Sequence, residues 1–463
     1  MLSRFRPGII LGVLLILLIG FIVQTGSVQS QPANTSQSVS SILFENVQIF
    51  NGKSEGLSTP SNVLVVGNKI QTISTTAIPA LPTVNLTRID GSGRVLMPGL
   101  IDAHVHLFTE TTPIAKLLSP DTPLEALVQQ AQTNATEMLL RGFTSARDLA
   151  GPVFELKQAI DRGDVVGPRI WPSGAMISQT SGHGDYRSLD ELPRTPTTSL
   201  SRAEVFGMTA IADGEAEVLR RAREQLMRGA SQLKVAAGGG VSSSYGPLDA
   251  NQFTESELRV AVQAATDWNT YVTAHAITSS AMQSAIRAGI KCIEHGQLMD
   301  EETAKLMAEK GAWLSIQPFL DDEDAIPFPE GSVSRSKQLE VVQGTDNAYK
   351  LAKKYNIKTA WSTDTLFDAR LATRQGAILA KMVRWYTPDQ VLKMATSTNA
   401  ELLSLSGPRN PYPGRLGVVE EGALADLLLV NGNPLDNIRL VENPSQNFVV
   451  IMKDGKLYKN LLR

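Results

Sequence analysis

The stretch GLIDAHVH at residues 99–106 is the first of eight apolar, strand-like runs in this 463-residue chain. The other seven are GFTSARDL (142–149), RIWPSG (169–174), SQLKVAA (231–237), TYVTAHA (270–276), IKCIEHG (290–296), AWLSIQP (312–318) and KTAWSTD (358–364). Amphipathic helical stretches separate them, most clearly at 214–230, 254–269 and 300–311. Strands that alternate with helices predict βα units around a parallel sheet. Eight units over about 300 residues favour a closed (β/α)8 TIM barrel over an open doubly wound sheet.

Short β-rich runs at both ends of the chain predict a second, smaller domain. They lie at 41–50, 62–68, 69–75, 425–433, 447–455 and 456–460. Gly, Ser, Asn and Pro residues punctuate the first set, which is typical of a small antiparallel sheet. We therefore expect an α/β protein in which 41–97 and 411–463 form one composite β-sandwich domain. The barrel domain would span 98–410, with 175–213 as an insertion over its mouth.

The first 40 residues differ from the rest in composition. Arg4 and Arg6 precede an apolar run at 8–23, and a polar stretch follows at 24–40. This is the layout of a secretory signal, and the run falls short of the roughly 20 residues that span a bilayer comfortably. The sequence predicts a signal peptide or a retained membrane anchor at 1–30 and a polar linker at 31–40. We expect a periplasmic or extracellular protein, or one anchored to the membrane by this segment.

Charge and cysteine content exclude several classes of protein. The chain has 43 Lys and Arg against 46 Asp and Glu, and this balance argues against a nucleic-acid binder or a disordered chain. The single cysteine, Cys292, excludes an intramolecular disulfide and a cysteine-based zinc cluster. The expected partner is a small-molecule substrate, with membrane contact through the N-terminal segment alone. The sequence leaves open whether the protein forms a homo-oligomer.

Histidines follow the predicted strands in a pattern that suits a metal site. His104 and His106 are two residues apart, so on an extended strand both side chains point to the same side. His275 and His295 lie near the ends of two later strands. Each of these two alone is more typical of a hydrogen-bonded core histidine. Together the four rings supply neutral nitrogen donors, which suit zinc and similar metals, at the catalytic face of a barrel.

Lys234 and Asp364 are the other notable residues on the predicted strands. Lys234 lies within a strand predicted to be buried, where an unpaired ammonium is strongly disfavoured. It needs a carboxylate partner, a path to the rim for its ammonium, or reaction of the neutral amine with carbon dioxide to a carbamate. Asp364 ends the eighth strand, beside the first strand when the barrel closes, and a helix N-cap is its alternative role.

These motifs in combination resemble the amidohydrolase superfamily of metal-dependent hydrolases. The resemblance covers nearly everything after residue 41. It is most similar to the imidazolonepropionase-like branch, which includes prolidase-type, Xaa-Pro dipeptidase-like enzymes. The motifs that carry it are LMPGLIDAHVHL (96–107), GFTSARDL (142–149), MISQTSGHGDYR (176–187), QLKVAAGGGVSS (232–243), VTAHA (272–276), IEHG (293–296), STD (362–364) and GALADLLLVNGNPL (422–435).

The resemblance implies a binuclear metal centre. One divalent ion, zinc in our expectation, would be held by His104, His106 and Asp364, and the other by His275 and His295. Carbamylated Lys234 and a hydroxide would bridge the two ions. The family often has Gly before the Thr-Asp of the eighth strand, whereas this chain has Ser362, a departure that leaves the ligand itself unchanged.

The expected reaction is hydrolysis of a C–N bond by attack of the bridging hydroxide. Asp364 would take the proton of the attacking group and pass it to the leaving amine. His183, in the Gly-rich loop after the third strand, would donate to the carbonyl oxygen, unless it is a loop residue without a role. Tyr245 would bind the far end of the substrate, and a plain turn residue is an equal alternative.

Dipeptides or N-acyl amino acids are the expected substrates, with three alternatives. An ester or lactone hydrolase would use the same hydroxide. A mononuclear deaminase would not need Lys234, which argues against it. A protein of another class, an inactive extracytoplasmic binding protein, would be expected to have lost at least one ligand, and all six are intact.

Overall fold

The structure is a computed structural model that describes residues 41–79, 86–195, 197–243 and 245–462. The signal or anchor expected at 1–30 and the linker at 31–40 lie outside the described residues, so both stay predictions, as does export. Within the described ranges, no helix has the length and apolar character that crossing a membrane requires.

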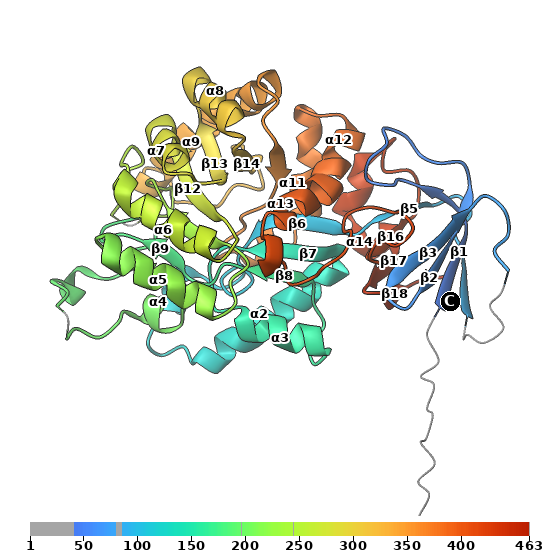
Figure 1. The fold of residues 1–463 in the computed structure, drawn as a ribbon, viewed down its shortest axis with the longest axis horizontal. Coiled ribbons are helices and arrows are strands. Elements are labelled where there is room, and N and C mark those ends of the chain that lie inside the picture. Colours follow the sequence, from blue (N-terminus) through green and yellow to red (C-terminus); the bar gives the residue numbers. More distant parts are fainter. Residues whose placement is uncertain (1–40, 80–85, 196, 244, 463) are drawn as a thin grey trace, which may run out of the picture. The chain divides into compact units, whose positions relative to one another are not determined.

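Two parallel sheets carry the strands expected for the barrel (Figure 1). One has the order β6-β7-β8, and the other has the order β10-β9-β11-β12-β13-β14-β15. All eight predicted runs contain a strand. Their bounds are β6 Leu100–Val105, β7 Phe143–Asp148, β8 Arg169–Pro172, β11 Leu233–Ala236, β12 Val272–Thr278, β13 Cys292–Leu298, β14 Trp313–Ile316 and β15 Thr359–Trp361.

Backbone hydrogen bonds join the two sheets at two places. At the first the Asp364 amide donates to the His104 carbonyl oxygen at 2.9 Å, which links the segment after β15 to β6. At the second the Ser231 amide donates to the Pro172 carbonyl oxygen at 2.8 Å, which links the segment before β11 to β8. The strand ladders do not continue from one sheet into the other, so the structure shows a mixed α/β fold with two parallel sheets.

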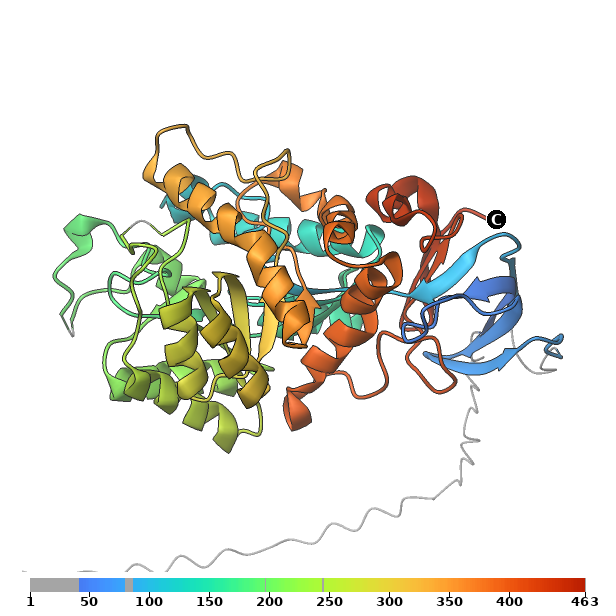
Figure 2. The same cartoon turned by 90° about the horizontal axis from the view of Figure 1, so that it is seen from above.

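Helices lie between the strands, and the three predicted at 214–230, 254–269 and 300–311 are confirmed as α5, α6 and α8. Thr254 accepts a hydrogen bond from the Glu257 amide at the start of α6, and Asp300 caps α8 in the same way. Figure 2 shows the long helix α9 in orange, which packs on β13. The helix bounds are α1 Ile114–Leu118, α2 Leu124–Leu140, α3 Phe154–Arg162, α4 Arg202–Val205, α5 Glu215–Met227, α6 Glu255–Asp267, α7 Ser279–Arg287, α8 Glu301–Lys310, α9 Val333–Lys354, α10 Ala369–Ala372, α11 Gln375–Ala380, α12 Pro388–Lys393, α13 Asn399–Ser404 and α14 Pro444–Asn447.

A third sheet joins strands from both ends of the described chain, whereas the predicted domain boundaries stay predictions. This eight-stranded sheet has the order β18-β17-β16-β5-β1-β2-β3, and β4 pairs with β1. The expectation of an antiparallel sheet is wrong in part, because β1 pairs in parallel with both β4 and β5. These two strands are short and were not predicted. The bounds are β1 Ser41–Ile49, β2 Ser61–Val66, β3 Lys69–Ser74, β4 Leu86–Asp90, β5 Val95–Pro98, β16 Leu427–Val430, β17 Phe448–Lys453 and β18 Lys456–Asn460.

The segment 175–213, predicted as an insertion, contributes two strands of its own. β9 (Met176–Ser178) pairs with β11, and β10 (Thr209–Ile211) pairs with β9. Three-residue strands carry too little periodicity to be recognised in a sequence. Met176 and Met208 line the cavity described below, so this segment contributes to the wall of the site.

Candidate active site

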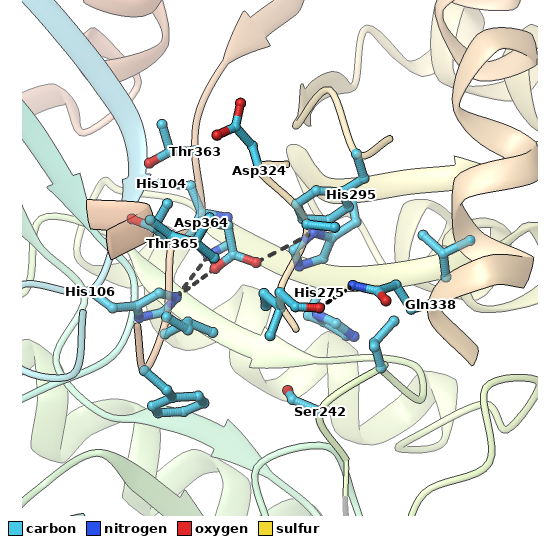
Figure 3. A pocket seen from close by; sticks show the side chains of 18 of the residues that line it. His104, His106, Ser242, His275, His295, Asp324, Gln338, Thr363, Asp364 and Thr365 are labelled. Atoms are coloured by element: carbon cyan, nitrogen blue, oxygen red, sulfur yellow. Dashed lines mark hydrogen bonds and ion pairs between the residues drawn. The ribbon is translucent and has the colours of Figure 1, made fainter. Parts of the chain in front are cut away.

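The six predicted metal ligands meet around one cavity, although they are spread over 260 residues of sequence. His104 lies in β6 and His106 directly follows it, whereas Asp364 comes three residues after β15. Figure 3 shows the Asp364 carboxylate between the His106 and His295 rings. The members of the predicted site that line the cavity are His104, His106, His183, Lys234, His275, His295 and Asp364.

His104, His106 and Asp364 form the tightest group. The Nε2 atoms of the two rings are 3.1 Å apart, and Asp364 Oδ1 lies 3.0 Å from His106 Nε2 and 3.3 Å from His104 Nε2. One ligand atom from each of the three residues lies within 4.8 Å of the others. Three donor atoms therefore converge on one point.

Each ring in this group also has an acceptor beside its Nδ1 atom. His104 Nδ1 lies 2.9 Å from the Glu294 carboxylate, and His106 Nδ1 lies 3.4 Å from the Ala150 carbonyl oxygen. A proton on Nδ1 satisfies these acceptors and leaves Nε2 with a lone pair for a metal ion. Burial lowers the pKa of His104 to about 3, which keeps this ring neutral.

The other two rings have the same kind of support. His275 Nε2 lies 3.0 Å from the Gly239 carbonyl oxygen, and His295 Nδ1 lies 2.8 Å from Gln317 Oε1. Gln317 Nε2 donates to Ser362 Oγ at 2.8 Å, so its oxygen is the atom that faces His295. Each ring thus donates through one nitrogen and leaves the other as a ligand atom.

This arrangement of atoms fits divalent metal ions. Two nitrogen lone pairs that face each other 3.1 Å apart, next to a carboxylate oxygen, repel one another without a cation between them. Burial works to raise the pKa of Asp364, but His104 and His106 hold it well below its usual range, so the carboxylate stays ionised. Neutral imidazoles with an ionised carboxylate are the donor set that zinc prefers.

Lys234 lies beside this group in β11 and is 2% exposed. Its Nζ is 3.5 Å from His104 Nε2, and among the described residues no carboxylate lies within 4.0 Å of it. Burial lowers the pKa of Lys234 to about 8. The sequence left two structural roles open for this ammonium, a carboxylate partner or a path to the rim. Among the described residues the structure shows neither.

Two of the predicted ligands have an unusual backbone conformation. His295 has a φ of 80° and Asp364 a φ of 50°, both in the left-handed region that costs side-chain-bearing residues energy. The side chains of Glu294 and His295 both reach the interior, although neighbours on a regular strand point to opposite faces. The left-handed turn at His295 interrupts that alternation, which allows both residues to serve one site.

His183 lies against the metal-ligand rings, whereas Tyr245 lies away from them. The His183 ring stacks on the His275 ring with 3.8 Å between centroids. A Cβ atom at Gly240 would be 2.3 Å from His183 Nδ1, so glycine is required there. Tyr245 is 41% exposed, does not line the cavity, and donates to the Arg187 carbonyl oxygen at 2.9 Å. A substrate contact by Tyr245 stays a prediction, without support from this geometry.

Sequence reasoning missed the acceptors behind the rings. Glu294 stands next to His295 in IEHG, and Arg147 lies inside GFTSARDL, so both belong to motifs that were recognised. Both residues could have been found because each is a charged residue inside an otherwise apolar strand, which is the feature that singled out Lys234. Burial works to raise the pKa of Glu294, but the Arg147 guanidinium beside it holds that pKa well below its usual range.

An apolar wall faces the ligand atoms across the cavity. It comes from the loop after β14 and from α9, and its members include Phe319, Leu320, Ile326, Phe328 and Val341. Ion pairs hold this loop in place. Lys381 lies 2.7 Å from Asp322 and 2.5 Å from Asp324, and Arg374 lies 2.6 Å from Asp324. Asp322, Asp324 and Lys381 also line the cavity, so this wall combines apolar side chains with paired charges.

The chain belongs to the amidohydrolase family, whose model matches residues 95–459. Ochratoxinase from Aspergillus niger is 34% identical over 379 residues, which cover 79% of this chain and 76% of that protein. The crystal structure of a prolidase complexed with N-methylphosphonate-L-proline has a TM-score of 0.82 and 30% identity, and covers 91% of this chain and 100% of its own. A Xaa-Pro dipeptidase with methionine in its active site has a TM-score of 0.78, 29% identity and the same coverage.

These findings confirm the family and the prolidase-type branch that the motifs indicate. The protein is a hydrolase that acts on carbon–nitrogen bonds, as its family and its relatives support. Members of this family generally use divalent metal ions, and the group of His104, His106 and Asp364 is the candidate site for one here.

Proposed function

We propose that the protein hydrolyses the amide bond of dipeptides or N-acyl amino acids at a binuclear metal centre. The observation that carries this proposal is the convergence of the His104 and His106 rings on the Asp364 carboxylate, beside a buried Lys234 that has no carboxylate within 4.0 Å among the described residues. Lys234 favours a binuclear centre over a mononuclear one, because a carbamate on its Nζ offers two oxygen ligands.

His104, His106 and Asp364 would hold one ion and His275 and His295 the other, with carbamylated Lys234 as the shared ligand. We propose zinc, because the donors are imidazole nitrogens and carboxylate-type oxygens. Two such ions, when bound, lower the pKa of a water molecule toward neutrality and polarise a carbonyl group.

The side chains around the ions have separate roles in the proposed reaction. Asp364 Oδ1 is shared by His104 and His106, whereas Oδ2 lies 3.9 Å from the nearest ring nitrogen of His295. Asp364 is therefore placed to take the proton of the attacking water and to pass it to the departing nitrogen as the C–N bond breaks. His183 lines the same cavity and donates to the carbonyl oxygen as negative charge develops there.

We also propose that the two parallel sheets close into a (β/α)8 barrel. The hydrogen bonds between Asp364 and His104 and between Ser231 and Pro172 support this closure, since each joins one sheet to the other. Closure would explain why Asp364, after the last strand, meets His104 in the first.

The apolar wall supports a substrate with a large apolar or aromatic group next to the scissile amide. Phe319, Ile326 and Phe328 can cover such a group while the carbonyl faces the ligand atoms. The names of two similar structures, a prolidase and a Xaa-Pro dipeptidase, support Xaa-Pro dipeptides as members of the proposed substrate class.

The direct test is a hydrolysis screen with the zinc-loaded enzyme. Xaa-Pro dipeptides, dipeptides with an aromatic residue, and N-acyl amino acids are compared with the matching esters. We expect release of the amine from at least one amide class, and loss of this activity after chelation with recovery on adding zinc. Turnover of the esters alone would contradict the proposal, and so would amide hydrolysis that chelation does not affect.

Replacing His183 by asparagine is predicted to lower kcat by about 100-fold, which is the lower end of the cost of removing one donor to a developing oxyanion. KM and the zinc content should stay close to those of the wild type, because His183 is not a proposed ligand. Steady-state kinetics and elemental analysis check this result. An unchanged kcat would leave His183 as a packing partner of His275.

Replacing Phe328 by alanine is predicted to lower kcat/KM at least about tenfold for a substrate with an aromatic group, because one apolar contact in a pocket contributes about 1–3 kcal/mol. The same change should hardly affect a substrate with glycine in that place. Val333→Ala is the matched control, since Val333 is 72% exposed and outside the cavity lining. Equal losses for both substrates would argue against a specificity wall.

A further inference from the structure

A fully buried ion pair lies next to the ligand rings, and the mechanism above does not use it. Arg147 in β7 and Glu294 in β13 are both 0% exposed, and Arg147 Nη2 donates to Glu294 Oε1 at 2.6 Å. Removing two charges from water costs hydration that their attraction does not always restore. Fold stability alone therefore does not account for a charged pair at this place.

Contacts from several strands hold the guanidinium of Arg147 in a single orientation. Its Nε donates to the Ala103 carbonyl oxygen in β6 at 2.6 Å, and its Nη1 donates to the Tyr271 hydroxyl at 3.1 Å. Ser315 Oγ in β14 accepts from Nη2 at 3.3 Å. These partners come from different parts of the two parallel sheets. The guanidinium therefore holds the Glu294 carboxylate, which it binds, in a fixed position.

Glu294 divides its two oxygens between this anchor and a ligand ring. Oε1 accepts from Arg147 and from Thr273 Oγ1, whereas Oε2 lies 2.9 Å from His104 Nδ1. The carboxylate thus cannot rotate without losing one of its charged contacts. His104 receives its orientation from Glu294, and Glu294 receives its own from Arg147.

His104 differs from the other three ligand rings in this respect. Among the described residues, His106 and His275 face backbone carbonyl oxygens on the side away from the cavity, and His295 faces the amide oxygen of Gln317. His104 Nδ1 lies 2.9 Å from the Glu294 carboxylate, whereas the carboxylate near His295 Nδ1 is that of Asp364, at 3.9 Å and in the cavity lining. A charged acceptor makes the opposite nitrogen a stronger donor to a metal ion than a neutral acceptor does.

We propose that Arg147 and Glu294 are positioning residues that fix the tautomer and orientation of His104 and strengthen its hold on a metal ion. This inference rests on the proposed function, because it takes His104 to be a metal ligand. It adds a role for a pair of residues that touch neither the substrate nor the ions. Arg147 acts through Glu294, and Glu294 acts through His104.

The test is the zinc affinity of Glu294→Gln, which keeps the shape of the side chain and removes its charge. Zinc binding is measured by equilibrium competition with a chromophoric chelator, on full-length protein whose melting temperature is recorded. We expect the affinity of at least one zinc site to fall about 10-fold to 100-fold, the usual cost of losing such a partner. Affinity within about twofold of the wild type would overturn the inference.

Asp426→Asn separates positioning from a general loss of stability. Asp426 is a buried carboxylate that pairs with Arg169 at 2.7 Å and does not line the cavity. We expect a lower melting temperature with unchanged zinc affinity. If Asp426→Asn lowered the zinc affinity as much as Glu294→Gln does, the effect would follow from destabilisation and the inference would fail.

A second variant covers the case in which Glu294→Gln does not fold because Arg147 is left as an unpaired buried charge. Replacing Arg147 by methionine together with Glu294→Gln removes both charges, and the same fall in zinc affinity is expected. The wild type in the same titration separates the two proposals. If the wild type binds two zinc ions and the variants bind them equally well, the positioning role is contradicted and the proposed function is not. If the wild type binds no zinc, the proposed function is contradicted as well.

Discussion

Replacing Lys234 by alanine is expected to remove most of the second metal ion and to lower turnover by more than about 100-fold. A metal ion that polarises a carbonyl contributes several kcal/mol to the transition state, and each 1.4 kcal/mol is a factor of ten in rate. Lys234→Arg should behave in the same way, because arginine keeps the charge but forms no carbamate. Metal content and kcat of the folded variants are the measurements.

Two comparisons make this result specific to the bridging role. A short-chain carboxylic acid should partly restore activity to Lys234→Ala, since a free carboxylate can occupy the position of the carbamate. Lys453→Ala is the matched control, because Lys453 is also buried, has a pKa lowered to about 8 by burial, and donates to the Gly167 carbonyl oxygen away from the cavity. It should lower the melting temperature and leave the metal content unchanged. Full activity with two ions in Lys234→Ala would contradict the bridging role.

Replacing Asp364 by asparagine is expected to lower kcat by about 1,000-fold to 10,000-fold, at the upper end of the contribution of a general acid–base group. The change keeps the size of the side chain but removes both the charge that His104 and His106 face and the proton acceptor for the attacking water. Steady-state kinetics on protein loaded with excess zinc give the rate loss.

Asp426→Asn provides the comparison for that variant. Asp426 is a buried carboxylate paired with Arg169 at 2.7 Å, and it does not line the cavity. Its replacement should reduce stability with little effect on kcat of the folded protein. If Asp364→Asn kept more than about a tenth of wild-type turnover, another group would have to move the proton.

The residues that gather around the cavity could be predicted from the sequence, because strand periodicity and chain order carry that information. His104 and His106 share one face of a strand, and the carboxyl ends of parallel strands meet at one edge of a sheet, so distant residues could be placed together. Lys234 stood out because a charge inside an apolar strand needs a partner. The structure brings all six proposed ligands to one cavity, as that reasoning predicts.

The groups that complete the site depend on contacts that no local pattern encodes. The carbonyl oxygens of Ala150 and Gly239 face ligand rings only because of how the loops after β7 and β11 fold back. Gln317 is an ordinary polar residue in the sequence, and its role follows from a neighbouring strand. The left-handed turn at His295, which lets Glu294 also face inward, cannot be read from the letters IEHG.

The small strands were missed for a related reason. β9 and β10 have three residues each, and β4 has mostly exposed side chains, so neither apolar alternation nor turn residues marked them. Their pairing depends on tertiary neighbours. The wall around Phe328 likewise depends on tertiary structure, because the loop after β14 and α9 form it together.

The metal content of the purified protein tests the central claim most directly. The chain is produced with ample zinc, freed of loosely bound metal by gel filtration, and analysed for zinc and other divalent metals against protein concentration from amino-acid analysis. The binuclear account predicts close to two ions per chain. At most one ion per chain would contradict it.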